Sequence, residues 1–249
     1  MAEVSTATPS LELRDIVKRF GGLTALDGVS IDVYSSEIVA LVGDNGAGKS
    51  TLVKIVAGVH QPTEGTVYVA GEPVDVSGPE QARAFGIEVV YQDLALANQQ
   101  QVFMNMYLGR EMRMKGLPIL DKRAMVRGTE EILSEFDIRI PSARSPVRDL
   151  SGGQRQGIAI GRATHWAKHL LLMDEPTAAL GVQETGKVEE IILRMRERGL
   201  ALLVVSHNLD QVFRIADRIA VLRRGKLVGV KRTAETDGDE IVAMITGLR

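Results

Sequence analysis

The chain has 249 residues, 45% hydrophobic and 25% charged, which is typical of a compact globular fold and excludes a disordered chain. The net charge of −2 excludes a global basic field that would recruit nucleic acid or anionic lipid, although local basic patches remain possible. The absence of cysteine excludes disulfides and thiolate metal sites, and no apolar run approaches the about 20 residues that span a bilayer.

Residues 1–10 lack the basic start and apolar core of a signal peptide, and we expect a short frayed tail there. Strands are expected next at 11–20 and within 29–43, where the second segment ends in the apolar run 38–42. Segment 65–74 alternates valines with polar residues and turns at Gly71, which predicts an antiparallel β element beside the main sheet. From 94 to about 166 the apolar residues change to helical spacing among many charges, so a helical insertion is expected.

Two continuous apolar runs follow, at 169–174 and 201–205, and a helical stretch at 182–198 separates them. Runs that are apolar on both faces fit buried parallel strands joined by helical crossovers. A hairpin at 219–230 and a short helix near 241–245 close the chain. This order predicts an α/β fold built on a parallel sheet.

A glycine-rich loop, GDNGAGKST, follows the apolar run 38–42 and precedes a helical pattern whose expected apolar face is Leu52, Ile55, Val56 and Val59. The pattern G-x-x-x-x-G-K-[ST] in a strand-loop-helix context predicts a phosphate-binding loop, although an ordinary glycine turn before a helix is the alternative. Lys49 can reach the β- and γ-phosphates of a nucleotide, and the hydroxyl of Ser50 can ligate Mg²⁺. The expected nucleotide-binding residues are Gly43, Asp44, Asn45, Gly46, Ala47, Gly48, Lys49, Ser50 and Thr51.

Two carboxylates, Asp174 and Glu175, end the apolar run at 169–174. At the carboxyl end of a parallel strand, Asp174 can bind the Mg²⁺ shell and Glu175 can act as the base that polarises a water. The alternative is that the two acids merely end a strand in solvent. A GTPase is disfavoured because the guanine-reading pattern N-K-x-D is absent.

A second glycine loop, LSGGQ, opens a helix expected to begin near Gly153, and Ser151 can cap that helix. The free N–H groups and the helix dipole then favour an anion beside Ser151, Gly152, Gly153 and Gln154. The first loop already wraps the phosphates within one subunit. If two chains pair head to tail about a twofold axis, each second loop can cover the nucleotide that the other chain holds.

In these motifs the chain resembles the nucleotide-binding subunits of ATP-binding-cassette (ABC) transporters, over nearly its whole length. GDNGAGKST resembles the Walker A motif, VVYQD the Q-loop, LSGGQ the signature, LLLMDEP the Walker B motif and VVSH the switch histidine. The resemblance implies a P-loop NTPase of ABC type, with a RecA-like parallel-sheet core, an antiparallel β subdomain and a helical subdomain. A single domain is expected over 1–249, with the core and β subdomain at about 11–92 and 167–249, and the helical subdomain at about 93–166.

The resemblance also assigns roles to three residues that are weak signals by themselves. Phe20 would stack on adenine, Gln92 would ligate Mg²⁺ and sense the γ-phosphate, and His207 would hold the γ-phosphate and the attacking water in line. Phe20 as a core residue, and Gln92 and His207 as ordinary polar residues after strands, are the alternatives. One position departs from the family pattern, because Gly181 stands where the D-loop usually ends in aspartate.

The segments PTAALGVQET and NMYLGRE resemble the ATPases of bacterial monosaccharide importers of the ribose, xylose and fructose kind. The resemblance implies a homodimer that hydrolyses ATP with Mg²⁺ at the cytoplasmic face of the membrane. It would act with integral-membrane permease subunits and, indirectly, a sugar-binding protein, and no nucleic acid is expected. A soluble cassette ATPase acting on nucleic acid or ribosomes is the alternative function. A sensor without turnover is countered by the intact Glu175.

Overall fold

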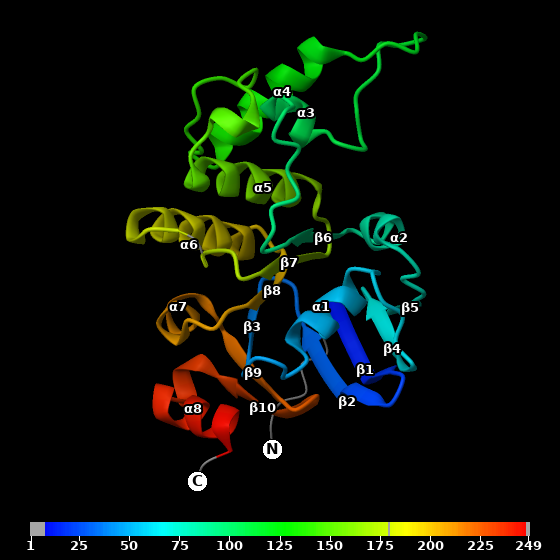
Figure 1. Cartoon of the computed structure of the whole chain (residues 1–249), viewed down its shortest axis with the longest axis vertical. Coiled ribbons are helices and arrows are strands. Elements are labelled where there is room, and N and C mark those ends of the chain that lie inside the picture. Colours follow the sequence, from blue (N-terminus) through cyan, green and yellow to red (C-terminus); the bar gives the residue numbers. More distant parts are fainter. Residues whose placement is uncertain (1–7, 179, 248–249) are drawn as a thin grey trace.

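The structure, a computed structural model, describes residues 8–178 and 180–247 (Figure 1). The expected N-terminal tail falls mainly on residues 1–7, outside this part of the chain. Within the described part, no helix combines the length and hydrophobicity that a membrane crossing requires.

A six-stranded sheet forms the centre of the fold, with the strand order β10-β9-β3-β8-β7-β6. Its members are β3 (Ile38–Val42), β6 (Ile87–Val90), β7 (Leu170–Asp174), β8 (Ala201–Val205), β9 (Arg218–Arg223) and β10 (Lys226–Arg232). The first five pair in parallel, and β10 adds antiparallel to β9 through the expected hairpin. The predicted α/β fold with buried parallel strands is therefore confirmed.

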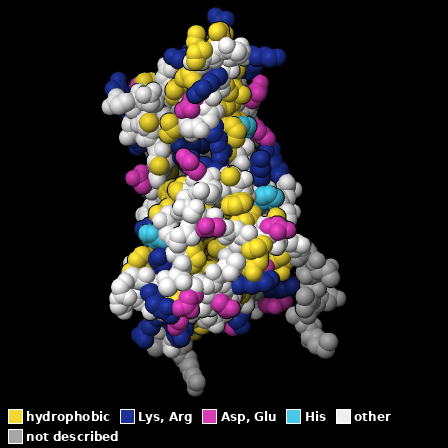
Figure 2. All heavy atoms as spheres, turned by 90° about the vertical axis from the view of Figure 1, so that its right-hand side faces the viewer, with side chains coloured by type: hydrophobic (Ala, Val, Ile, Leu, Met, Phe, Trp, Pro, Cys, Tyr) yellow, Lys and Arg dark blue, Asp and Glu magenta, His cyan; other side chains and the backbone are white. Residues whose placement is uncertain are grey.

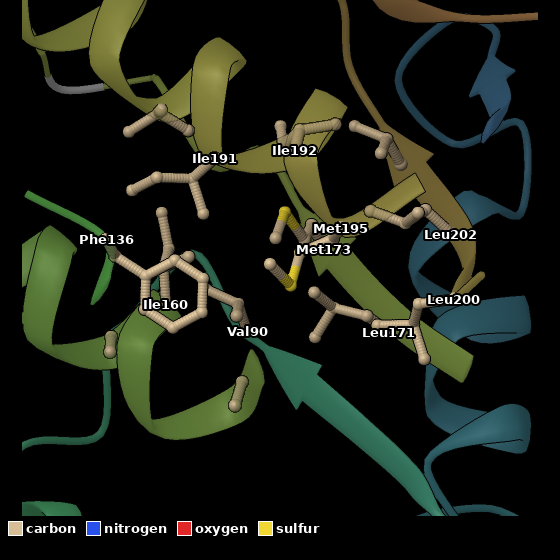
Figure 3. Close-up of a cluster of buried hydrophobic side chains, with 14 of the residues drawn as sticks. Val90, Phe136, Ile160, Leu171, Met173, Ile191, Ile192, Met195, Leu200 and Leu202 are labelled. Carbon is tan, nitrogen blue, oxygen red and sulfur yellow. The ribbon is translucent and has the colours of Figure 1, made fainter. Parts of the chain in front are cut away.

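Both faces of this sheet are buried, as the continuous apolar runs indicated. In β3, Ala40 and Val42 face one hydrophobic cluster while Val39 and Leu41 face another, and all four are 0–1% exposed. Figure 3 shows the first cluster, in which side chains of β6, β7 and β8 meet Phe136, Ile160 and the apolar face of α6 (Val182–Glu197). Helix α1 (Lys49–Val56) packs into the second cluster.

A separate four-stranded antiparallel sheet, ordered β2-β1-β4-β5, completes the second cluster. Its strands are β1 (Leu11–Phe20), β2 (Leu23–Val33), β4 (Glu64–Val69) and β5 (Glu72–Val74). The antiparallel β element expected at 65–74 is confirmed, and strands β1 and β2 belong to it rather than to the central sheet. Strand β2 also begins at Leu23, well before the expected segment.

Helices make up the region between β6 and β7 (Figure 1), as the periodicity predicted. They are α3 (Val102–Met106), α4 (Lys122–Glu135), a 3-10 turn at Val147–Asp149 and α5 (Gly152–Trp166). The expected boundaries of the helical subdomain, near residues 93 and 166, stay a prediction. The remaining helices are α2 (Pro79–Ala84), α7 (Leu209–Ile215) and α8 (Gly238–Thr246), with a second 3-10 turn at Thr233–Glu235.

The apolar face expected for the helix after the phosphate loop extends one residue too far. Helix α1 ends at Val56, and Val59 lies beyond it with 46% of its surface exposed. Gly58 adopts a left-handed φ of 74° directly after the helix, which ends the run before Val59 can join the buried face.

Candidate active site

The first glycine loop lies between the carboxyl end of β3 and the start of α1. Gly43 has φ 152°, and a Cβ there would lie 2.1 Å from the carbonyl oxygen of Leu222. Gly48 has φ 108°, and a Cβ there would lie 2.8 Å from the carbonyl oxygen of Ala25. Only glycine fits both positions, because side chains are strained at these angles and neighbouring backbone fills the space. The loop can thereby curl so that its N–H groups and the N-terminus of α1 face an anion.

The ammonium group of Lys49 lies inside this loop. Its Nζ donates to the carbonyl oxygens of Gly43 at 2.6 Å and Asp44 at 3.0 Å. Burial lowers the pKa of Lys49, while the charges of Glu175, Asp44 and Asp174 raise it in part. A cation held beside the loop can bind the terminal phosphates of a nucleotide.

The carboxylates and the histidine lie at the same edge of the sheet as the loop, because β3, β8 and β7 are parallel neighbours in that order. His207 Nδ1 is 2.8 Å from Glu175 Oε2. Glu175 has a positive φ of 52°, and its N–H donates to the carbonyl oxygen of Val205 at 2.9 Å. Strained backbone of this kind is common at functional sites. Burial, followed by the charge of Glu175, raises the pKa of Asp174.

A buried amide supports the loop that carries His207. Gln211 is fully buried in α7, and its Oε1 accepts from the hydroxyls of Ser206 and Thr177, each at 3.1 Å. Asn208 caps α7 by accepting from the N–H of Gln211 at 3.1 Å. The loops after β7 and β8 are therefore joined through one side chain, which fixes Glu175 and His207 relative to each other.

One cleft of about 1030 Å³ is lined by residues of all these elements. It brings together the sequence-predicted residues Phe20, Gly43, Asp44, Asn45, Gly46, Ala47, Gly48, Lys49, Ser50, Thr51, Gln92, Asp174, Glu175 and His207. Phe20 is 43% exposed on this cleft, so the alternative that it belongs to the core is wrong. The ring of His60 meets the ring of Phe20 edge to face, with centroids 5.2 Å apart.

The cleft also contains residues that the sequence patterns did not indicate. Arg224 and Gly225, from the turn between β9 and β10, line it together with Leu23, Thr24 and Ala25 of β2. Gly225 donates to the carbonyl oxygen of Ala47 at 2.9 Å, which seats this turn against the phosphate loop. No local sequence signal connects the turn of the expected hairpin to the phosphate loop.

The donor set of the cleft fits Mg²⁺. Ser50, Gln92 and Asp174 line it together, and each offers an oxygen ligand. Among the described residues, no group of three or more His, Asp or Glu side chains could hold a metal ion.

The second glycine loop lies elsewhere. Ser151 is the N-cap of α5, as predicted: its Oγ accepts from the N–H of Gln154 at 3.2 Å, and Gln154 Oε1 accepts from the N–H of Ser151 at 3.0 Å. Ser151, Gly153 and Gln154 line a different hollow of about 210 Å³, shared with Glu184 of α6. None of the described residues that line the phosphate-loop cleft comes from this second loop.

A glycine-rich loop and a lysine at the end of a central parallel strand, with carboxylates at the same sheet edge, define a P-loop nucleotide-binding protein. The family profile described as "ABC transporter" matches residues 26–178. The chain belongs to this family and is an ABC transporter ATPase.

Relatives of similar sequence support this assignment. The chain is 45% identical to the xylose/arabinose import ATP-binding protein XylG of Sulfolobus acidocaldarius, over 95% of this chain and 93% of that protein. It is 43% identical to the fructose import ATP-binding protein FrcA of Rhizobium meliloti, over 97% of this chain and 95% of that protein. The ribose import ATP-binding protein RbsA of Yersinia pestis matches at 40% identity over 96% of this chain but only 46% of that protein.

Solved structures show the same fold. An ATP-binding cassette of an ABC transporter, MJ1267 in its ADP conformation, is similar with a TM-score of 0.78 and 26% identity, over 96% of each chain. A nucleotide-free cassette is similar with a TM-score of 0.79 and 27% identity, over 96% of this chain and 95% of that chain. The expected cassette fold with its antiparallel β subdomain is therefore confirmed.

Proposed function

We propose that this chain hydrolyses ATP to energise sugar import through a membrane permease, and that it works as a head-to-tail homodimer. The names of the XylG, FrcA and RbsA relatives, all ATP-binding proteins of sugar import, support the sugar assignment. Its permease partners would hold it at the cytoplasmic face of the membrane, with a sugar-binding protein acting on the permease. The particular sugar is left open, because these three relatives serve different sugars.

The residues of the cleft have different proposed roles in binding and hydrolysing ATP. The loop amides and Lys49 bind the β- and γ-phosphates, and Phe20 stacks on the adenine. Glu175 is the base: His207 engages its Oε2, which leaves Oε1 to take a proton from the attacking water. His207 and Gln92 hold the γ-phosphate and the water in line. Ser50, Gln92 and Asp174 would hold Mg²⁺, which supplies charge neutralisation at the phosphates when bound.

The separation of the two glycine loops is the main observation that supports the proposed dimer. Ser151 in its capping box keeps a hydroxyl hydrogen to donate, and the N-terminus of α5 favours an anion, yet neither belongs to the cleft that holds the phosphate loop. A second copy, related by a twofold axis, would bring its Ser151, Gly152, Gly153 and Gln154 onto the γ-phosphate bound by the first. Two equivalent sites would then form at one interface.

Glu175→Gln tests the assignment of the base. The variant should still bind ATP but accumulate as a closed dimer, with hydrolysis lowered by several orders of magnitude because the amide cannot accept the proton. Size-exclusion chromatography and phosphate release measure the two effects. Glu197→Gln, an isosteric change at an exposed position of α6, is the control and should behave as the wild type. Near-normal turnover by Glu175→Gln would reject Glu175 as the base.

Two further measurements address the nucleotide and the interface. Lys49→Ala should lose ATP binding itself, measured by calorimetry, and unaltered affinity would count against the phosphate loop. Hydrolysis per molecule should fall on dilution, because the complete site needs two copies. A rate per molecule that does not change with concentration would refute the dimer.

The proposed role in import is tested by identifying the partner proteins and measuring their effect on ATP hydrolysis. The reading frames adjacent to the one for this chain should encode a permease with several membrane spans and a secreted sugar-binding protein. ATP hydrolysis by the reconstituted complex should rise when the loaded binding protein is added. Stimulation by nucleic acid or ribosomes instead would favour the soluble cassette ATPase.

A further inference from the structure

An ordered loop projects from the end of the molecule that carries α3 and α4 (Figure 1). Residues 112–120 of this loop, named here the basic-apolar tip, reverse direction around Gly116. Arg113 and Leu120 form an isolated antiparallel bridge, and the N–H of Met114 donates to the carbonyl oxygen of Ile119 at 2.9 Å. These backbone bonds hold the tip in a defined shape, so its side chains form a lasting surface.

The tip exposes large apolar side chains that the fold leaves uncovered. Met112, Met114, Leu117 and Ile119 are 42%, 46%, 51% and 56% exposed, and every residue from 112 to 119 is exposed. Removing apolar surface from water is favourable, so four partly exposed apolar side chains on one loop favour binding to an apolar phase. Figure 2 shows hydrophobic and basic side chains gathered at the corresponding end of the molecule.

The charges of the tip are all basic. Arg113 and Lys115 alternate with the two methionines, and no acidic residue lies between positions 112 and 120. Among the described residues, neither Arg113 nor Lys115 has an ion-pair partner within 4.0 Å. This small segment is therefore cationic, although the chain as a whole has a net charge of −2.

The two acids that flank the tip are turned back onto the backbone. Glu111 accepts from the N–H of Gly109 at 3.0 Å, and backbone N–H groups lower the pKa of its carboxyl. Asp121 caps α4 by accepting from the N–H of Ala124 at 2.9 Å. Both carboxylates keep their negative charge, and Glu111 also interacts with the charge of Arg113. Lys122 and Arg123 follow Asp121, however, so residues 111–123 hold four basic and two acidic side chains and remain cationic.

We propose that the basic-apolar tip docks onto an anionic phospholipid bilayer, with Met114 and Leu117 entering the headgroup region and Arg113 and Lys115 binding the lipid phosphates. Apolar side chains interleaved with basic ones are the composition that binds membrane interfaces. A second copy of the chain is a poor occupant, because two identical cationic tips repel each other. The proposal concerns a lipid contact of the ATPase itself and does not depend on the proposed sugar import or on ATP.

Vesicle flotation of the purified chain without nucleotide tests the proposal. Binding is expected to phosphatidylcholine vesicles that contain phosphatidylglycerol, and it should weaken when salt is raised to about 0.5 M. Arg113→Gln with Lys115→Gln should lower the partition coefficient about 30-fold, since each basic residue contributes about fivefold at such a surface. Met114→Ser with Leu117→Ser should abolish it. Val228→Ser with Val242→Ser, which removes two valines exposed to 41% and 46% elsewhere, should leave it unchanged.

A fluorescent reporter locates the contact independently. Leu117→Trp should show a blue shift and an intensity gain on anionic vesicles, whereas Val242→Trp should not, measured against the single native tryptophan. Absence of vesicle binding by the wild type, equal binding to neutral vesicles, or binding that survives in both tip variants would each overturn the proposal. So would loss of permease association in tip variants that bind vesicles normally, because the occupant would then be a protein.

Discussion

Ser151 has two separable roles, one within its own chain and one proposed across the dimer, and substitutions can divide them. Ser151→Ala removes the oxygen that accepts from the N–H of Gln154 at 3.2 Å at the start of α5. Losing an N-cap costs about 1 kcal/mol of folding stability. With a urea m-value of about 3 kcal/mol/M for a chain of this size, the unfolding midpoint should fall by about 0.3 M.

Ser151→Asp restores the cap but changes the charge. Its carboxylate can accept from the same N–H and also interacts favourably with the positive end of α5, worth about 0.3–1 kcal/mol. Stability should therefore equal or exceed that of the wild type. Hydrolysis should nevertheless collapse, because a carboxylate has no hydrogen to donate and repels the γ-phosphate proposed to lie there. Ser151→Asn, a neutral cap, is the matched control and should retain more activity than Ser151→Asp.

Urea unfolding without nucleotide and phosphate release at saturating ATP measure the two quantities on the same preparations. If Ser151→Asp hydrolyses ATP at the wild-type rate, Ser151 does not face a phosphate and the shared site is wrong. If Ser151→Ala unfolds at the wild-type urea concentration, the capping box does not stabilise α5. The two outcomes are independent, since one reports the chain alone and the other the assembled site.

Three other substitutions follow from the same geometry. Gly43→Ala should abolish ATP binding and lower stability by about 1–3 kcal/mol, since its Cβ would lie 2.1 Å from the carbonyl oxygen of Leu222; calorimetry and urea unfolding measure this. Asp174→Asn should be more stable than the wild type at pH 7 but not near pH 3. The pKa of Asp174 is raised in the folded chain, so ionising this carboxyl costs folding stability. The cost begins as the pH rises above about 3.9, the pKa of aspartate in an unfolded chain. Gly153→Ala should lower hydrolysis with little change in stability, because its Cβ would displace the flexible side chain of Glu184, 2.7 Å away.

Each of these changes has a control or a contradicting result. Gly46→Ala meets no atom within 4 Å and should be milder than the change at Gly43, since only its φ of 80° is unfavourable. Urea curves of Asp174→Asn that lie below the wild type at pH 7 would contradict the burial argument. Gly152→Ala has open space and should hydrolyse ATP faster than Gly153→Ala. The reverse order would show that the contact with Glu184 is unimportant.

Much of the central sheet could be predicted because its strands are apolar on both faces. The runs at 38–42, 170–173 and 201–205 contribute buried side chains to both hydrophobic clusters, so their burial is visible as unbroken apolar letters. The sheet to which β1 belongs could not be predicted, because an alternating strand has the same pattern in either sheet. Helices α2 and α7 have six and seven residues, too short for a periodic signal.

In the site, likewise, features set by neighbouring residues could be predicted from the sequence, whereas features set by contacts between distant segments could not. The phosphate loop and the predicted cap at Ser151 are set by neighbouring residues, and the structure adds the reciprocal bond from Gln154 that completes a capping box. Arg224 and Gly225 enter the cleft only because a hairpin far along the chain bonds to Ala47. No spacing within the hairpin reports that contact.

Helix α5 begins at the signature loop and ends at Trp166, whose indole Nε1 donates to the carbonyl oxygen of Met106 at 3.3 Å. Its 15 residues form a rod of about 22 Å. Arg162, near the far end of the rod, donates to the carbonyl oxygens of Leu94 at 3.3 Å and Ala95 at 3.5 Å, just beyond Gln92. A helix moves as a rigid unit. A displacement of the segment after β6, which contains Gln92, would therefore also displace Ser151.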